Sequence, residues 1–137
     1  MRGLLVDVNV EGHLPYLLFR LEALQLRNFL SDIGIEFATF ESVRIARDIS
    51  DRDLWHRCQD LGWVLFAENR NHADSLEAVL TDSWREGCIP VITLSDKSTF
   101  ERQRIYADRV ATSIAEVLFA IKEEAKYRTE PRIWVPL

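Results

Sequence analysis

Carboxylate and amide side chains follow several of the short apolar runs in this sequence. Asp7 comes directly after the apolar residues 4–6, Asn9 follows closely, and Asp51 stands at the start of a helical pattern. Two further clusters of polar residues follow later apolar runs. Their members include Glu68, Asn69, Arg70, Asn71, Asp74 and Lys97. Oxygen ligands suit a hard divalent cation that keeps several of its waters. A metal site built from these residues is therefore the first chemistry to consider.

Short apolar runs alternate with helical periods along the chain, and this alternation predicts the elements that would position the polar residues. The predicted strands are about 3–6, 35–40, 63–67, 89–94 and 133–135, and the predicted helices are about 14–31, 50–61, 75–86 and 99–127. This order predicts an α/β fold, a three-layer sandwich with a mainly parallel central sheet. Ligands bind beyond the carboxyl ends of such strands, so the polar residues are expected at one edge.

Length and composition restrict the function further. The chain has 137 residues, of which 47% are hydrophobic and 28% charged, so we expect a single domain over residues 1–137. The net charge of −5 argues against a general nucleic-acid coat protein. Two cysteines exclude a disulfide framework and a cysteine-rich zinc site. The apolar runs are too short to cross a membrane, so we expect no membrane partner and a cytoplasmic location.

Three segments together resemble a known family. They are Leu-Leu-Val-Asp-Val-Asn at 4–9, the helix entry Ser50-Asp51, and Ala-Glu-Asn-Arg-Asn at 67–71. These motifs resemble those of PIN-like domains, and most closely the short stand-alone bacterial branch related to toxin ribonucleases. Residues 74–77 and 90–93 also match a sub-branch. The likeness extends over nearly the whole chain, although each motif is short.

The resemblance implies a PIN-like fold and a ribonuclease that depends on Mg²⁺ or Mn²⁺ and hydrolyses RNA phosphodiesters. Asp7, Asp51 and Asp74 would be the catalytic acids, and the metal ligands would be these three together with Asn69. Asn69 stands where many PIN domains have an acid, so Asp74, or else Glu68 or Glu77, would have to supply the third carboxylate. The substrate would be bound by four residues, namely Asn9, Arg70, Asn71 and Lys97. The family likeness also implies a toxin component with an antitoxin-like partner.

Structural explanations remain open for several of these residues. Asp51 and Asp74 are favourable at helix starts through capping and the helix dipole alone. The asparagines at 9, 69 and 71 are also typical of turns. Asp7 is different, because a carboxylate that closes a buried strand needs partners.

Other functions also remain open. A chain that lacks the third acid would be a PIN-like binding or regulatory module rather than an enzyme. A phosphatase or nucleotide-binding domain that uses the same acidic edge is a third reading. The apolar and aromatic residues exceed what one small core needs, so we also expect a homodimer.

Overall fold

A parallel β-sheet forms the centre of the molecule. The computed structural model describes residues 1–68 and 75–137. Within these residues one five-stranded sheet has the order β2-β1-β3-β4-β5, and every neighbouring pair is parallel. The strands are β1 (Gly3–Val6), β2 (Glu36–Thr39), β3 (Trp63–Glu68), β4 (Val91–Leu94) and β5 (Arg132–Val135). The five predicted strands are therefore confirmed.

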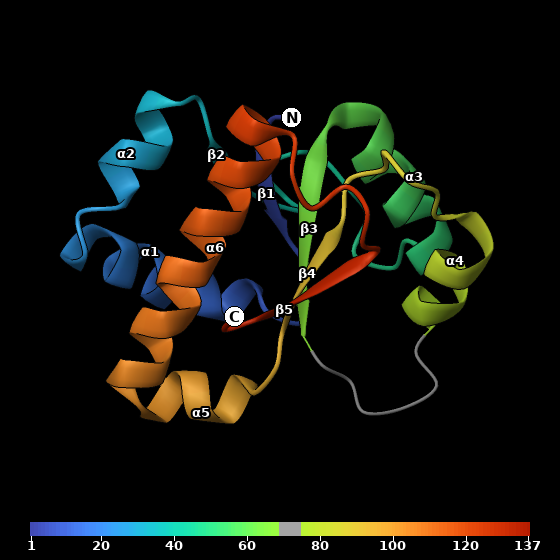
Figure 1. Ribbon diagram of the computed structural model, residues 1–137. Coiled ribbons are helices and arrows are strands. Elements are labelled where there is room, and N and C mark those ends of the chain that lie inside the picture. Colours follow the sequence, from blue (N-terminus) through green and yellow to red (C-terminus); the bar gives the residue numbers. More distant parts are fainter. Residues whose placement is uncertain (69–74) are drawn as a thin grey trace.

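Helices cover both faces of this sheet (Figure 1). One face carries the short 3-10 helix η1 (Glu11–His13) and the helices α1 (Leu14–Ala23), α2 (Arg27–Asp32), α5 (Lys97–Arg102) and α6 (Arg104–Glu124). The other face carries α3 (Asp51–Leu61) and α4 (Ser75–Ser83). The structure thus confirms the predicted α/β class, with three layers and a sheet whose strands are all parallel.

The side chains of the central strands divide the core into two parts. Leu4 and Val6 of β1 pack in the cluster beneath α1 and α6, whereas Leu5 between them packs in the cluster beneath α3 and α4. Successive residues of a strand point to opposite faces, and this explains the division. All four residues of β1 are buried. A continuous apolar run is typical of a strand that is covered on both faces.

The prediction of one helix over 14–31 is wrong, because the helix ends at Ala23 and a second begins at Arg27. Gln25 has a φ of 61°, and its N–H donates to Glu22 O at 3.0 Å. The N–H of Leu26 donates to Leu21 O at 2.8 Å. These two bonds form a Schellman motif, in which the left-handed residue is usually glycine. Glutamine occupies that position here, so the sequence carries no stop signal.

The prediction of one helix over 99–127 is also wrong. Gln103 is extended, with φ −121° and ψ 110°, and it separates α5 from α6. Helix α5 also begins earlier than predicted, because Asp96 caps it by accepting the N–H of Thr99 at 3.0 Å. The helix predicted over 75–86 ends at Ser83. Apolar periodicity does not reveal a break of a single residue.

The start of α3 follows the sequence closely. The Ser50 side chain accepts the N–H of Asp53 at 3.1 Å, and Gly62 ends the helix in the left-handed conformation with φ 83°. Both signals lie within one turn of the helix ends. The local sequence is therefore sufficient to place α3, and with it Asp51.

Replacing Ser50 with Ala is expected to lower the free energy of unfolding by about 1 kcal/mol, because an N–H of the first turn loses its acceptor. Urea unfolding followed by circular dichroism measures this change. Ser50→Asn keeps a capping acceptor and should retain most of the stability. An equal loss in both variants would show that the cap is not the cause.

Candidate active site

The order of the strands identifies one position on the sheet as suited to a ligand. From β1 the chain moves outward to β2, and the later strands are added on the opposite side, beginning with β3. Ligands of parallel sheets bind beyond the carboxyl ends of the strands where the order reverses in this way. Asp7 directly follows β1, and its N–H donates to Phe66 O of β3 at 2.9 Å. Asp7 therefore lies at this switch point.

Asp7 is buried and held in place. Asp7 is 4% exposed, and among the residues that the structure describes it is the only buried acid. Asn9 Nδ2 donates to Asp7 Oδ2 at 3.4 Å, and the N–H of Val10 donates to Asp7 O at 2.9 Å. The structure thus places Asn9 beside Asp7, whereas its role in binding substrate stays a prediction. Burial of a carboxylate is costly without such partners.

The charge of Asp7 acts on the α3 side of the sheet. Burial, and to a smaller extent the negative charge of Asp7, raise the pKa of the Cys58 thiol on α3 to about 12. Charge near a buried group is poorly screened by solvent. Leu5, two residues before Asp7, packs in the cluster beneath α3, and side chains alternate along a strand, so Asp7 is directed to the α3 side as well.

Thiol reagents at pH 8 are expected to modify Cys88 quickly and Cys58 only slowly in the folded protein. The thiolate is the reactive form, and Cys58 is 1% exposed with a pKa of about 12, whereas Cys88 is half-buried. Peptide mass spectrometry after a short labelling pulse distinguishes the two sites. Cys88→Ser should leave no rapidly labelled thiol, and both cysteines should react in urea. Equal labelling of the two in native protein would contradict this assignment.

Asp51 connects the starts of two helices. It is the first residue of α3, and its carboxylate accepts a hydrogen bond from the hydroxyl of Ser75, the first residue of α4. These residues line a hollow of about 450 Å³ together with Ile49, Ser50, Arg52, Ala78 and Val79. Since α3 runs back to the start of β3, its first residue lies toward the carboxyl edge of the sheet. Asp7 and Asp51 thus occupy the same side of the same edge.

The contact between Asp51 and Ser75 is not predictable from the sequence. Ser75 carries a weak signal, because serine is typical of a helix start. Its partner is 24 residues away, and no local pattern in the sequence connects the two positions.

Lys97 also lies at the carboxyl edge, and it is already engaged with an acid. Its Nζ is 2.8 Å from the Glu68 carboxylate, which ends β3. A phosphate that binds Lys97 would have to compete with this carboxylate. The role of Lys97 in binding substrate stays a prediction.

The two alternative acids occupy different places. Glu68 lies at the end of β3, next to β1. Glu77 is 3.5 Å from the guanidinium of Arg132 on β5, and β3 and β4 separate β5 from β1. Of these two acids, Glu68 is therefore the better placed to act with Asp7.

Four of the predicted site residues, Asn69, Arg70, Asn71 and Asp74, lie outside the described residues. Within residues 1–68 and 75–137, no group of three or more His, Cys, Asp or Glu side chains is arranged to hold a metal ion. Mg²⁺ is usually held through one or two carboxylates and several waters. Asp7 and Asp51 have the donor chemistry that such an ion needs, and Asp74 stays the predicted third acid.

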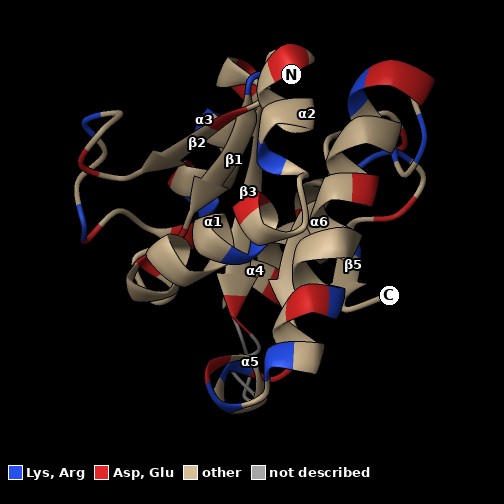
Figure 2. Cartoon of the chain, turned by 90° about the vertical axis from the view of Figure 1, so that its left-hand side faces the viewer, with Lys and Arg blue, Asp and Glu red and all other residues tan. Residues whose placement is uncertain are grey.

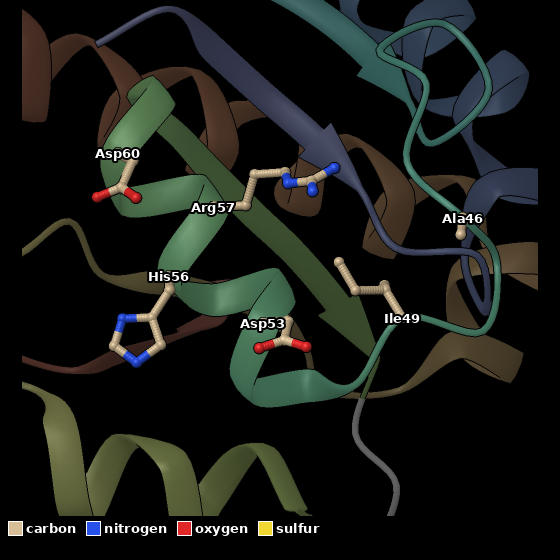
Figure 3. A pocket seen from close by; sticks show the side chains of 6 residues that line it. All are labelled: Ala46, Ile49, Asp53, His56, Arg57 and Asp60. Carbon is tan, nitrogen blue, oxygen red and sulfur yellow. The ribbon is translucent and has the colours of Figure 1, made fainter.

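Another hollow, of about 400 Å³, lies on the outer face of α3 (Figure 3). Asp53, His56, Arg57 and Asp60 project from the helix, and the preceding loop contributes Ala46 and Ile49. The α3 side chains that line it are exposed. Because no buried charged group faces this hollow among its lining residues, the candidate site remains at Asp7.

Among the described residues, no helix is both long and apolar enough to span a membrane.

Comparison of the chain with protein-family models, with curated proteins and with solved structures finds no significant match. The likeness to PIN-like domains therefore depends on the sequence motifs alone.

Proposed function

We propose that this protein is a PIN-like ribonuclease that uses Mg²⁺ or Mn²⁺ to hydrolyse RNA phosphodiesters. The burial of Asp7 at the switch point of the sheet is the observation on which the proposal depends. A buried carboxylate costs free energy that an apolar residue would not. Its position beyond a central strand is the one where parallel sheets bind ligands. Function accounts for an acid at this position better than stability does.

The proposed roles follow from the contacts of each acid. Asp7 and Asp51 would hold the metal, with Asp74 and Asn69 as the further ligands that the motifs imply. Asn9 and Ser75 orient these two acids through their hydrogen bonds. A bound divalent ion lowers the pKa of its water and neutralises charge on the phosphate.

The substrate contacts of this site are proposals from the sequence. Arg70 and Asn71 would bind the RNA backbone, and Lys97 would join them when phosphate displaces Glu68 from its ammonium group. Charge-assisted hydrogen bonds of this kind are among the stronger ones.

A protein partner and a homodimer remain part of the proposal. Several large apolar side chains are exposed, with Ile105 at 73% and Phe19 at 61%. Such side chains could support contact with an antitoxin-like protein or with a second copy of the chain.

The pair Glu68–Lys97 favours a second candidate function, a binding or regulatory module. This ion pair neutralises one acid and one base at the proposed site. Calorimetry with Mn²⁺ discriminates between the two functions. Binding at micromolar to millimolar metal supports the enzyme, and the absence of binding at millimolar metal supports the module.

The experiment that tests the enzyme compares Asp51→Asn with Asp53→Asn. Both residues lie in the first turn of α3, so both changes remove the same charge from the same helix end. Asp51 contacts α4, whereas Asp53 lines the outer hollow. Cleavage of a labelled RNA with Mn²⁺ should fall at least about tenfold in Asp51→Asn only, a change of about 1.4 kcal/mol in the barrier. Absence of cleavage by the wild type, or equal rates in both variants, would refute the proposal.

A further inference from the structure

A third hollow, of about 260 Å³, lies between η1, the first turn of α1 and α5, and it is lined by Gly12, His13, Tyr16 and Glu101. Two backbone hydrogen bonds connect it to the candidate site. The N–H of Val10 donates to Asp7 O, and the N–H of His13 donates to Val10 O, both at 2.9 Å. The hollow is therefore held at a defined position relative to Asp7.

Aromatic rings form one wall of this hollow. Tyr16 meets the ring of Phe100 edge-on, with centroids 5.3 Å apart, and the His13 ring lies 5.8 Å from the same ring. Phe100 is 1% exposed and contacts both rings. Rings that are already held in place lose little conformational entropy when a ligand stacks on them. Single-stranded RNA is commonly bound by bases that stack on such side chains.

A carboxylate stands at the mouth of the hollow. His13 Nε2 is 2.6 Å from Glu101 Oε1, and the Glu101 side chain is 53% exposed. His13 Nδ1 is buried and has no hydrogen-bond partner among the described residues. The histidine therefore positions Glu101, and it has no accessible nitrogen left to exchange a proton with substrate.

The remaining wall is open. A Cβ atom added at Gly12 would meet no atom within 4 Å. The hollow is therefore open on the Gly12 side. An exposed carboxylate accepts hydrogen bonds from an amino group, as acids do with the N4 amino group of cytosine.

We propose that this hollow binds a nucleobase of the RNA substrate, and that Glu101 favours bases that carry an exocyclic amino group. The identification of the ligand as RNA rests on the proposed function. Arg102 and Arg104 are exposed beside Glu101, where they could meet the neighbouring phosphates. Figure 2 shows basic and acidic segments side by side around α5. With a net charge of −5, the protein gains little from general attraction to RNA, so contacts with bases matter more.

Binding of the hexanucleotides of cytidine, adenosine and uridine tests the proposal. Fluorescence anisotropy in EDTA at one low salt concentration measures each Kd without cleavage. Wild-type protein should bind the cytidine and adenosine hexamers more tightly than the uridine hexamer. Glu101→Gln replaces a charge-assisted hydrogen bond with a weaker neutral one, so it should weaken binding of the first two by about tenfold and leave the third within about twofold. Tyr16→Leu should weaken all three by about tenfold, because uracil also stacks.

The matched control is Glu123→Gln, which makes the same charge change at an exposed position near the C-terminal end of α6, far along the chain from α5. It should leave all three affinities unchanged. Structural damage from Glu101→Gln would weaken the binding of all three hexamers equally. A loss of affinity that depends on the base therefore separates recognition from misfolding.

Two results would overturn the nucleobase site. One is wild-type protein that binds none of the hexamers, and the other is Glu101→Gln with the same effect on uridine as on cytidine. Failure of the proposed ribonuclease function is distinguishable from both of these results. Base-dependent binding without cleavage in Mn²⁺ would refute the nuclease and keep the site, whereas cleavage without base dependence would do the reverse.

Discussion

Replacing Asp7 with Asn is expected to reduce the rate of RNA cleavage in Mn²⁺ at least about a hundredfold. The carboxylate is proposed to hold the metal, whose stabilisation of the transition state is worth several kcal/mol. Each 1.4 kcal/mol corresponds to about a tenfold change in rate. An amide has nearly the same shape and can still accept the hydrogen bond from Asn9. The fold is therefore expected to persist, and circular dichroism with thermal unfolding checks that it does.

The control for this variant is Asp96→Asn. Asp96 is an acid that follows β4 at the same edge of the sheet, and asparagine preserves its capping of α5. Its cleavage rate should stay within about twofold of the wild type. Undiminished cleavage by folded Asp7→Asn would exclude Asp7 as the metal carboxylate.

Asp7→Asn also has a readout that does not depend on activity. The negative charge of Asp7 is the smaller of two causes that raise the Cys58 pKa, and burial is the larger. Without that charge the pKa should fall below about 12 while remaining above the ordinary value for a thiol. The pH dependence of Cys58 alkylation in the Cys88→Ser background measures this shift.

Gly3→Ala is expected to lower the free energy of unfolding by at least about 2 kcal/mol. A Cβ atom at this position would lie 1.9 Å from the carbonyl oxygen of Glu36. Gly3 and Glu36 are paired in the β1–β2 register, so the clash is with the backbone of the neighbouring strand. A backbone contact can be relieved only by moving the strand, and overpacking of this kind commonly costs 1–3 kcal/mol or more.

Gly12→Ala is the matched control for this change. The added Cβ meets no neighbouring atom, so the stability should stay within about 0.5 kcal/mol of the wild type. Urea unfolding of the two variants under the same conditions measures the difference. Similar stabilities would show that β2 can move away from β1 at little cost.

Local signals in the sequence account for most of the elements. Apolar runs indicate the strands, and Ser50 and Gly62 indicate both ends of α3. These signals act through hydrogen bonds and side-chain packing within a few residues. The same reasoning fails at Gln25 and Gln103, where an ordinary residue adopts the conformation that ends a helix. Nothing in the type of these residues distinguishes them from the interior of a helix.

The burial of Asp7 could also be expected, because an acid that ends an apolar strand remains close to the core. Its contacts with Asn9 and Val10 are local in sequence. By contrast, Asp51 meets Ser75 across 24 residues and His13 meets Glu101 across 88. These pairs form only when helices from different crossovers are set next to each other.

Strand order decides which side chains meet at the edge of the sheet. Apolar patterning indicates where the strands lie, but it does not say which strand lies beside which. In the observed order β1 and β3 are neighbours, whereas β5 lies on the far side of β4. Glu68 is therefore near the candidate site and Glu77 is turned toward Arg132. Residue type supplies the chemistry of each group, and packing of the whole chain selects its partners, because hydrophobic burial is not directional.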